Sequence, residues 1–324
     1  MKSNFNSWVE KYRPKKLCEV TAQTDTINAL KKVIITKNIP HLIFFGPSGC
    51  GKTSTILALA KDLFGNKYYN DRIIELNASD ERGINVIREK IKNYAKKAIN
   101  YNSDIPPWKI IILDEADNMT PDSQFALRRI MEEYSKITRF CIICNYHNKI
   151  IDPINSRCAL FHFKPISHND ILAKLNYICE NENFKCPEIF INQIINNSRG
   201  DLRKAINFLQ KCQNTYGNIL NQNILYEISG VIPSFIINDL THAIINKNSS
   251  KIDFIINNVI NDGYSLVNQI LFFDDFIKNS TFTSQQKSLL SLKLIEIDNN
   301  LLKGSDEYIE FMKLAYDFSK IINI

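Results

Sequence analysis

Five short apolar runs, separated by stretches with helical patterns, constrain the fold of this chain more than any other feature of its sequence. The runs cover residues 41–45, 73–77, 109–113, 139–144 and 159–163. The helical patterns lie near residues 24–37, 52–64, 83–100 and 122–135. Strands that alternate with helices form a parallel sheet covered by helices. The N-terminal part of the chain is therefore predicted to have an α/β fold.

A glycine-rich segment after the first apolar run predicts a phosphate-binding loop. It has the spacing G-x-x-x-x-G-K-[ST] and lies between a strand-like run and a helix-like stretch, as such a loop requires. Glycines let backbone N–H groups turn toward phosphate at a helix N-terminus. Lys52 is expected to reach the outer phosphates, and the Thr53 hydroxyl to bind Mg²⁺. The residues expected to contact the nucleotide here are Gly46, Pro47, Ser48, Gly49, Cys50, Gly51, Lys52, Thr53 and Ser54.

Two carboxylates end the third apolar run. The run leads into Asp114 and Glu115, a pattern typical of a buried parallel strand whose carboxyl end opens onto a ligand crevice. We expect Asp114 to bind Mg²⁺ and Glu115 to polarise the water that attacks the γ-phosphate. Taken alone, residues 114–117 would more simply be a solvated turn. With a phosphate loop upstream, they favour binding and hydrolysis of a nucleoside triphosphate.

The composition narrows the remaining classes of protein. No apolar stretch of membrane-spanning length occurs, and the N-terminus lacks a signal-peptide core, so we expect a soluble intracellular protein with no membrane partner. The eight cysteines are scattered, mostly in apolar contexts, which favours reduced thiols. Cys141 and Cys144 resemble half of a metal site, but on a strand they would point to opposite faces, so no zinc site is expected.

The net charge of +6 is unevenly distributed. Residues 231–324 contain 8 Lys and Arg against 11 Asp and Glu, so the basic surplus arises upstream of them. A basic surplus in the nucleotide-binding part of the chain could bind an acidic polymer.

The chain is long enough for two or three domains, because 324 residues exceed the usual size of one hydrophobic core. Strand signals fade beyond Pro165. Three short helical patterns follow, at residues 168–183, 187–197 and 201–214, and a longer set from about residue 231 includes 285–298 and 306–322. We therefore predict domains at residues 1–165, 166–230 and 231–324.

Further motifs narrow the class of phosphate-loop protein. They are Trp8 to Pro14 (WVEKYRP), Leu76 to Gly83 (LNASDERG), Cys144 to Tyr146, Ser156 to Cys158 and Gly200 to Arg203. Their order and spacing resemble those of replication factor C small subunits, clamp-loader members of the AAA+ ATPases, and are most like the eukaryotic subunit four type. The resemblance is close from residue 8 to about residue 215. It implies an AAA+ α/β domain, a small helical lid domain and an all-helical C-terminal collar that serves in oligomerisation.

The resemblance also implies roles for single residues. Asn145 matches the asparagine that orients the attacking water, although an asparagine after a strand is also a common turn former. Arg203 matches the lid arginine that senses the γ-phosphate, although without its motif it would be one more surface charge. Val9, Tyr12 and Arg13 match the segment that lines the adenine pocket.

Arg157 carries the most distinctive implication of the resemblance. In this family the Ser-Arg-Cys arginine lies on the outer edge of its own domain and enters the ATP site of the adjacent subunit. An arginine delivered in this way accelerates hydrolysis by about 10³ to 10⁵. The isolated chain is therefore expected to bind ATP but to hydrolyse it poorly.

A basic helix face is a candidate for DNA contact. Arg88, Lys92 and Lys96 recur every four residues and so share one face of the predicted helix. Such stripes are often plain solvated faces, but the basic surplus and the DNA-lined interior of the resembled assemblies favour a role. The residues predicted to contact duplex phosphates are Arg82, Arg88 and Lys149.

The phosphate loop departs from the family pattern at two positions. Clamp-loader loops usually have proline and threonine where this chain has Ser48 and Cys50. Because the glycine spacing is kept, binding should survive. Cys50 would lie near Lys52 and a helix N-terminus, both of which lower the pKa of a thiol, so we hypothesise a reactive cysteine that the nucleotide protects. The simpler alternative is a small side chain that fits.

The resemblance implies an ATPase subunit of the replication factor C clamp loader. Such a subunit joins other replication factor C subunits in a hetero-pentamer in the nucleus. With ATP and Mg²⁺ it opens a sliding clamp of the PCNA type and loads it onto primer–template DNA in replication and repair. Two alternatives stay open at this point. They are another AAA+ DNA motor, such as a branch-migration helicase, and a nucleotide-locked structural subunit of the same assembly.

Overall fold

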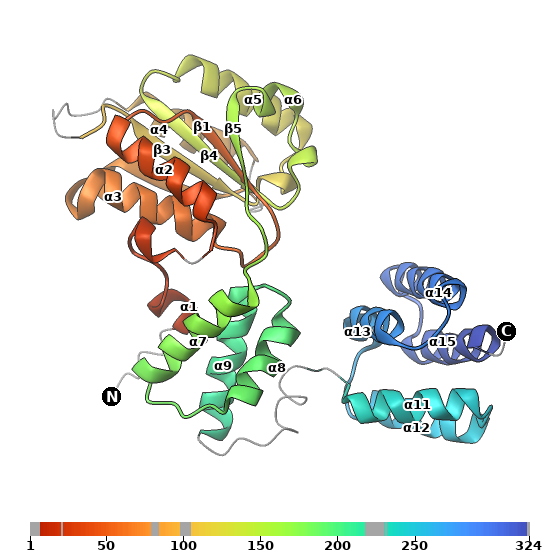
Figure 1. Cartoon of the computed structure of the whole chain (residues 1–324). Coiled ribbons are helices and arrows are strands. Elements are labelled where there is room, and N and C mark those ends of the chain that lie inside the picture. The colour runs from red at the N-terminus through yellow and green to blue at the C-terminus, as the bar shows by residue number, and fades with distance from the viewer. Residues whose placement is uncertain are drawn as a thin grey trace. The chain divides into compact units, whose positions relative to one another are not determined.

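The apolar runs form a single parallel sheet in the N-terminal part of the chain. The computed structural model describes residues 7–20, 22–78, 84–97, 105–217, 230 and 232–322, and Figure 1 shows their helices and strands. The chain divides into two compact units, Met1–Asn218 and Ile219–Ile324. The first unit holds the sheet, the helices that cover it and the helices of residues 168–216 that follow it, and the second unit is helical.

The sheet has five strands in the order β2-β3-β4-β1-β5, all parallel. The strands are β1 (His41–Phe45), β2 (Ile73–Asn77), β3 (Lys109–Asp114), β4 (Thr138–Cys144) and β5 (Cys158–His162). Each coincides with a predicted run to within one residue at either end. The strand order puts β4 between β1 and β3, and it makes β2 and β5 the edges of the sheet.

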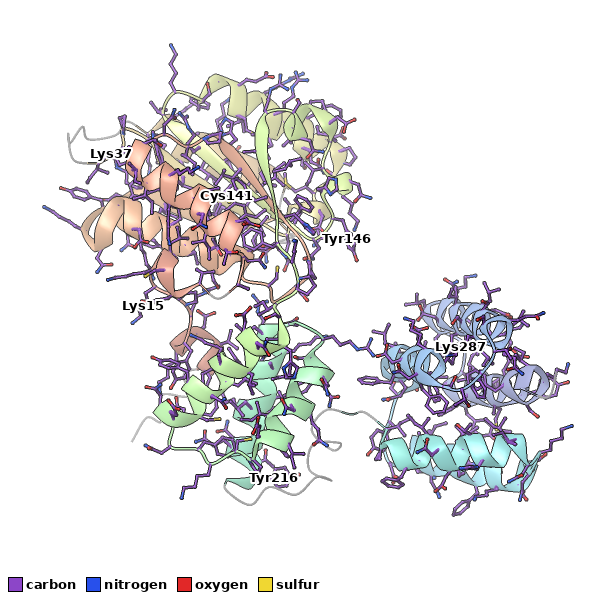
Figure 2. All side chains as sticks on the ribbon, in the orientation of Figure 1. Lys15, Lys37, Cys141, Tyr146, Tyr216 and Lys287 are labelled. Carbon is purple, nitrogen blue, oxygen red and sulfur yellow. The ribbon has the colours of Figure 1, made fainter. Side chains whose placement is uncertain are left out.

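Helices cover both faces of the sheet, as predicted. On one face, α2 (Thr24–Thr36) and α3 (Lys52–Arg72) bury Leu30 and Ile56 against Phe44 and Cys141 of the strands. On the other, α4 (Ile84–Lys96) and α5 (Pro121–Glu133) pack in a separate cluster that includes Cys144. Cys141 and Cys144 thus contribute to different faces, as the alternation along a strand requires. Cys141 lies in the interior of the unit in Figure 2.

Helix α3 extends beyond the predicted end at residue 64. A kink at Gly65, with φ 62° and ψ 170°, separates its two parts, and this interruption hides the second part from the helical pattern. The second part is held because Tyr68 and Tyr69 pack against the same apolar cluster as the first. The longer helix is therefore a product of tertiary packing.

Three short helices follow the sheet, as the sequence predicts. They are α7 (His168–Asn181), α8 (Glu188–Ser198) and α9 (Leu202–Tyr216). The Ser167 hydroxyl accepts a hydrogen bond from the Asp170 N–H and caps α7, and Asp201 caps α9 in the same way. A short N-terminal helix, α1 (Trp8–Lys11), joins this group through a hydrogen bond from the Trp8 N–H to Gln210 Oε1 at 3.0 Å.

Short helical turns complete the first unit. They are η1 (Leu17–Glu19), η2 (Ala116–Asn118), η3 (His147–Lys149) and α6 (Asp152–Asn155). Two of them, η2 and η3, follow the carboxyl ends of β3 and β4, where the sequence places its polar motifs.

The second unit consists of helices around its own apolar core. They are α11 (Ser234–Ile245), α12 (Ser249–Asn261), α13 (Leu266–Asn279), α14 (Ser284–Leu302) and α15 (Glu307–Ile322). Ile256, Ile277, Leu290, Ile297 and Phe311 are among its most buried side chains. Helices α14 and α15 correspond to the two patterns predicted in this part of the chain. Among the described helices, none combines the length and apolarity needed to cross a membrane.

Candidate functional site

The strand order brings the polar motifs together at one edge of the sheet. The phosphate loop follows β1, Asp114 ends β3, and Asn145 follows β4, which lies between them. Because all strands are parallel, their carboxyl ends meet at the same edge, where ligands of open α/β sheets bind. The three motifs, widely separated in sequence, therefore line a common cavity.

The backbone of the phosphate loop depends on its glycines. Gly46, Gly49 and Gly51 have φ values of 143°, 66° and 94°, a region that other residues rarely adopt. A Cβ on Gly46 would lie 2.1 Å from the Phe163 carbonyl oxygen. The loop then leads into α3, whose first N–H groups are available to an anion. This geometry suits the binding of a phosphate chain.

Lys52 is the central cation of the site and is only 8% exposed. Its Nζ donates hydrogen bonds to the carbonyl oxygens of Gly46 and Pro47, both at 2.7 Å, and to Asn145 Oδ1 at 3.1 Å. These partners fix the ammonium group between the phosphate loop and the end of β4. Lys52 and Asn145, far apart in sequence, are thus in direct contact.

Thr53 and Asp114 form a second pair of contacts. The Thr53 hydroxyl donates to Asp114 Oδ2 at 2.7 Å, and the Glu115 N–H donates to Asp114 Oδ1 at 2.9 Å. A hydroxyl and a carboxylate within this distance offer the oxygen ligands that Mg²⁺ prefers. The residues predicted to bind the metal therefore fit it.

Glu115 has a strained backbone and an exposed side chain. Its φ of 54° and ψ of 37° lie in the left-handed region, which costs a residue other than glycine about 1–3 kcal/mol. Asn118 Nδ2 donates to Glu115 Oε2 at 3.4 Å, and the side chain faces the cavity. Strained residues of this kind cluster at functional sites. The Glu115 carboxylate thus borders the cavity, and its role as a general base stays a prediction.

The cavity has a volume of about 200 Å³ and combines core and lid residues. The predicted nucleotide residues that line it are Val9, Tyr12, Arg13, Ser48, Gly49, Cys50, Gly51, Lys52, Thr53, Ser54, Asp114, Glu115, Asn145 and Arg203. Gly46 and Pro47 are not in direct contact with the cavity, and they act on it through their carbonyl bonds to Lys52. Arg203 enters from the first turn of α9 and is exposed.

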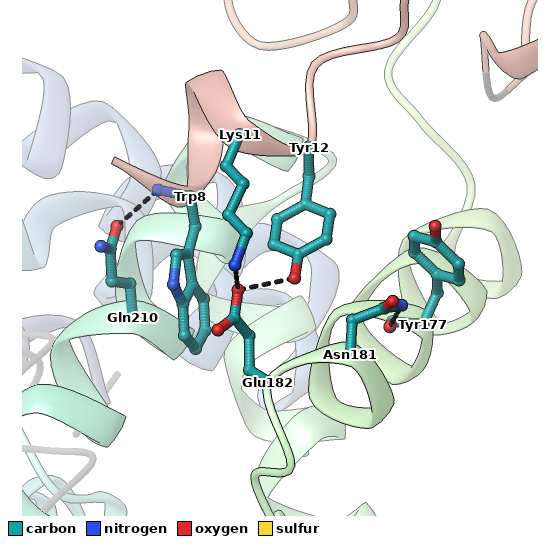
Figure 3. Close-up of polar contacts among 7 residues, drawn as sticks. All are labelled: Trp8, Lys11, Tyr12, Tyr177, Asn181, Glu182 and Gln210. Carbon is teal, nitrogen blue, oxygen red and sulfur yellow. Dashed lines mark hydrogen bonds and ion pairs between the residues drawn. The ribbon is translucent and has the colours of Figure 1, made fainter. Parts of the chain in front are cut away.

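The N-terminal segment is fastened to the lid by a carboxylate. Glu182 Oε1 accepts hydrogen bonds from Lys11 Nζ and from the Tyr12 hydroxyl, both at 2.6 Å (Figure 3). Burial and then the hydrogen bond to Glu182 raise the pKa of Tyr12. Arg13 Nε donates to Ser54 Oγ at 3.4 Å, which links the segment to α3 as well. These contacts hold Tyr12 and Arg13 at the cavity wall.

Sequence reasoning missed several side chains of the site. Lys174 of α7, Leu202 and Ile206 of α9, and Asp117 also line the cavity. The two α9 residues could have been predicted from the sequence. Leu202 and Ile206 are four residues apart and so share one face of the helix, next to Arg203. Lys174 and Glu182 carry no motif, and only the folded lid reveals them.

Arg157 lies away from this cavity. It precedes β5, whose first residue pairs with the first residue of β1, so it sits at the amino-terminal edge of the sheet. Its guanidinium forms an ion pair with Glu132 Oε1 at 2.7 Å and donates to the Pro153 carbonyl oxygen at 2.6 Å. A five-residue strand is about 16 Å long, which separates Arg157 from the phosphate loop of its own chain.

The predicted DNA contacts are described only in part. Lys149, in η3, is exposed, and its Nζ lies 5.4 Å from the ring centre of Tyr146, itself an exposed side chain (Figure 2). Arg82 and the side chain of Arg88 lie outside the described residues. The DNA assignment stays a prediction.

The expected reactivity of Cys50 is wrong. Burial raises the pKa of the Cys50 thiol and outweighs the opposing effect of Lys52. The side chain is 1% exposed, and its thiol donates to the Pro47 carbonyl oxygen at 2.9 Å. The sequence placed the thiol beside a cation correctly, but it could not show that apolar packing excludes water. Cys50 is a small buried side chain that supports the loop.

Comparisons with known proteins match each part of the chain to a family. Residues 42–166 match the family of ATPases associated with various cellular activities (AAA), residues 173–213 match the RCF1/5-like AAA+ ATPase lid domain, and residues 232–316 match the replication factor C C-terminal domain. Among solved structures, the Thermotoga maritima RuvB Holliday junction branch migration motor aligns with a TM-score of 0.52 at 15% identity, over 73% of this chain and 80% of that one. That likeness concerns the fold alone.

Curated relatives match along nearly the whole chain. Replication factor C subunit 2 of Schizosaccharomyces pombe is 43% identical over 97% of this chain and 94% of its own length. Replication factor C subunit 4 of Homo sapiens is 44% identical over 95% and 86%. The replication factor C small subunit of Archaeoglobus fulgidus is 42% identical over 97% of both chains. With its AAA+ domain, lid domain and helical C-terminal domain, the chain therefore belongs to the replication factor C small subunits.

Proposed function

We propose that this chain binds Mg²⁺-ATP in the cavity between its sheet and lid and hydrolyses it as a subunit of the replication factor C clamp loader. The observation that carries the proposal is the convergence of two hydrogen-bonded pairs, Lys52–Asn145 and Thr53–Asp114, at adjoining strand ends. A phosphate loop alone would support binding. The acidic pair Asp114–Glu115 beside it supports hydrolysis.

The residues of the site divide between holding the nucleotide and holding the metal. The phosphate loop and Lys52 would bind the phosphates, while Val9, Tyr12 and Arg13 would contact the adenine end of the cavity. Thr53 and Asp114 would hold Mg²⁺, which neutralises charge on the phosphate oxygens when it is bound. On phosphate binding, Lys52 would exchange its carbonyl partners for phosphate oxygens and keep Asn145 within reach.

Hydrolysis needs a base and a group that orients water. Glu115 is exposed to the cavity and would accept a proton from the attacking water. Asn145 would fix the position of that water with its amide, while Arg203 would contact the γ-phosphate from the lid. Asn118 donates a long hydrogen bond, 3.4 Å, to the Glu115 carboxylate and would help to orient it.

A complete site requires a positive charge from another subunit. Arg157 is on the opposite edge of the sheet from the cavity of its own chain, and its guanidinium is exposed to about 40%. We infer that it enters the ATP site of an adjacent subunit, where it stabilises charge that develops during hydrolysis. Assembly would therefore activate each site, and Glu132 would hold the arginine in place.

The partners follow from the family and the charge distribution. The chain would assemble with other replication factor C subunits into a hetero-pentamer in the nucleus, with the helices of residues 231–324 as its collar. It would open a sliding clamp of the PCNA type and place it on primer–template DNA during replication and repair. Arg82, Arg88 and Lys149 are proposed to contact the duplex phosphates.

Nucleotide binding by the full chain tests the central claim. Lys52→Ala should weaken Mg²⁺-ATP binding by about a hundredfold or more, because it removes a buried charged partner of the phosphates. Lys31→Ala, at an exposed lysine of α2, is the matched control and should bind as the unaltered chain does. Titration calorimetry measures both. The proposal fails if the unaltered chain has no affinity for Mg²⁺-ATP.

The assembly is tested separately. Co-expression with the four related subunits should yield one complex whose ATP hydrolysis rises with a ring-shaped clamp and primer–template DNA. Recovery of this chain only as a free monomer would contradict the proposed place in a clamp loader.

A further inference from the structure

The phosphate loop and the lid are joined by a hydrogen bond that the usual clamp-loader loop cannot make. The Ser48 hydroxyl donates to Asp201 Oδ2 at 2.9 Å. The family loops usually carry proline at this position, and proline has neither a hydroxyl nor a backbone N–H. The contact therefore depends on the Ser48 hydroxyl.

Asp201 uses its two oxygens for different purposes. Oδ1 accepts a hydrogen bond from the Lys204 N–H at 3.0 Å and so caps α9, while Oδ2 accepts from Ser48. The residue is only 9% exposed, which protects both bonds from competition with water. One carboxylate thus fixes the start of the lid helix and attaches it to the phosphate loop.

Gly49 allows this close approach. A Cβ at Gly49 would lie 1.8 Å from Asp201 Oδ1, so a larger residue would push the carboxylate away. The Leu202 N–H also donates to the Gly49 carbonyl oxygen at 3.3 Å. The middle glycine of the loop therefore serves the contact with the lid as well as the conformation that phosphate binding requires.

Arg203 follows two residues after Asp201, on the first turn of α9. Its side chain lines the cavity, and its backbone direction is set by the same turn that Asp201 caps. We propose that Asp201 is a positioning residue, and that the Ser48–Asp201 hydrogen bond holds Arg203 over the phosphate loop before the nucleotide arrives. This inference rests on the proposed ATPase function.

The expected consequence is a lid that is preorganised for the γ-phosphate. Without the serine hydroxyl, the backbone bond between Leu202 and Gly49 still joins the two parts, so the lid would loosen without detaching. Apparent affinity falls in proportion to the fraction of molecules in the binding-competent arrangement. The loss should be larger for ATP than for ADP, since Arg203 is proposed to contact the γ-phosphate.

The first experiment needs no nucleotide. Hydrogen exchange at the Leu202 and Lys204 amides of the full chain should accelerate on the order of tenfold in Ser48→Ala, because a hydrogen bond to a charged acceptor is lost. Ser48→Thr, which keeps a hydroxyl, should restore slow exchange. Lys204→Ala, at an exposed side chain of the same turn, is the matched control and should leave the Leu202 amide unchanged. Equal exchange in Ser48→Ala and the unaltered chain overturns the proposal.

The second experiment asks whether the bond acts through Arg203. Mg²⁺-ATP and Mg²⁺-ADP affinities are measured for the unaltered chain, Ser48→Ala, Arg203→Ala and the double variant. Ser48→Ala should weaken ATP binding by about five- to tenfold and ADP binding less, and it should add little once Arg203 is absent. Additive losses would mean that Ser48 acts only within the loop, and they would overturn the positioning role.

Lys52→Ala separates this inference from the proposed function. If the unaltered chain binds Mg²⁺-ATP and Lys52→Ala does not, the ATP site stands, and the Ser48 variants alone decide the positioning role. If the unaltered chain binds no nucleotide, the proposed function fails, while the exchange measurement still supports or overturns the contact between loop and lid.

Discussion

The two units of this protein differ in how their polar and large apolar side chains are placed. In the first unit, several polar side chains of the cavity are partnered within the chain, as Lys52 is by Asn145 and Thr53 is by Asp114. The first unit exposes six large apolar side chains among its described residues, and the second, smaller unit exposes eleven. Examples in the second unit with exposed fractions between 58% and 74% are Phe235, Phe254, Leu292, Ile295, Leu302, Ile309 and Tyr316.

This contrast separates chemistry from assembly. A partnered polar network is fixed by the fold of one chain, whereas a surface of exposed apolar residues on several helices is typical of a protein–protein interface. Arg157 of the first unit is also partnered within the chain, by Glu132, but its exposed side chain lies far from the cavity of its own chain. If the contrast is right, changes in the first unit should abolish hydrolysis without affecting assembly, and changes in the second should do the reverse.

The largest effect is expected at Arg157. Arg157→Ala should lower ATP hydrolysis at the adjacent site of the assembled complex by about 10³-fold or more, because it removes the charge delivered to the transferred phosphoryl group. Steady-state hydrolysis by the purified complex measures the loss. Arg128→Ala, at a neighbouring arginine that also approaches Glu132, is the matched control and should have a small effect. Undiminished hydrolysis with Arg157→Ala would disprove action on a neighbour.

Glu115→Gln should give the next largest loss. The amide cannot accept a proton from water, so hydrolysis should fall by about 10² to 10⁴ while Mg²⁺-ATP affinity stays within a few fold. Single-turnover hydrolysis by the complex, together with nucleotide titration, distinguishes the two quantities. Glu133→Gln on α5 removes another exposed carboxylate as a control. A normal rate with Glu115→Gln would assign the base to another residue.

The same contrast explains which parts of the fold and of the site could be predicted from the sequence. All five strands were predicted to within one residue. The three central strands are buried, continuous apolar runs, and the edge strands β2 and β5 are only partly buried but still mostly apolar. The site was predicted where a backbone or chemical requirement dictates residue type, as at Gly51, Lys52 and Asp114. The lid contacts of Glu182 and Lys174 were not, because a carboxylate or lysine on a short helix carries no local signal of its distant partner.

In the second unit the sequence predicted α14 and α15 by residue range and the other helices only by class. Even α14 has only a weak amphipathic pattern. On α14 the buried face includes Leu290, Leu294 and Ile297, while Leu292 and Ile295 are exposed on another side. Apolar residues on two faces blur the periodicity that identifies an amphipathic helix. The reactivity of Cys50 was misjudged for a related reason, since burial cannot be deduced from sequence neighbours.

An intermediate effect is expected for assembly through α14. Replacing Leu292 and Ile295 with glutamate should weaken incorporation into the complex by about ten- to a hundredfold, because two charges would have to be buried where about 1.5–3 kcal/mol per apolar side chain was gained. Both positions are exposed, so the unit itself should fold normally.

Competition for limiting partner subunits measures this loss, and circular dichroism checks the fold. Gln285→Glu adds a charge at an exposed polar residue of the first turn of α14 as the control. Mg²⁺-ATP affinity of the free chain should not change in the double variant. Full incorporation of the double variant would remove α14 from the proposed interface.

The smallest effect is expected at Glu182, whose carboxylate holds the N-terminal segment against the lid. Burial alone would raise the pKa of Glu182, but hydrogen bonds from Lys11 and Tyr12 outweigh it and lower the pKa below 4.5. A carboxylate whose pKa is lowered by folding stabilises the folded state at pH values above its pKa in the unfolded chain, and this stability is lost as the pH falls through its pKa in the folded protein.

Glu182→Ala should therefore weaken ATP binding about two- to threefold at neutral pH and remove part of the acid sensitivity of folding. Glu182→Gln, which keeps an acceptor for the Tyr12 hydroxyl, should retain most of the affinity, and Glu180→Ala on the exposed side of α7 should retain all of it. Because the predicted loss is confined to the variant that leaves Tyr12 without its partner, an affinity in Glu182→Ala equal to that of the unaltered chain would show that the contacts to Glu182 do not position the segment.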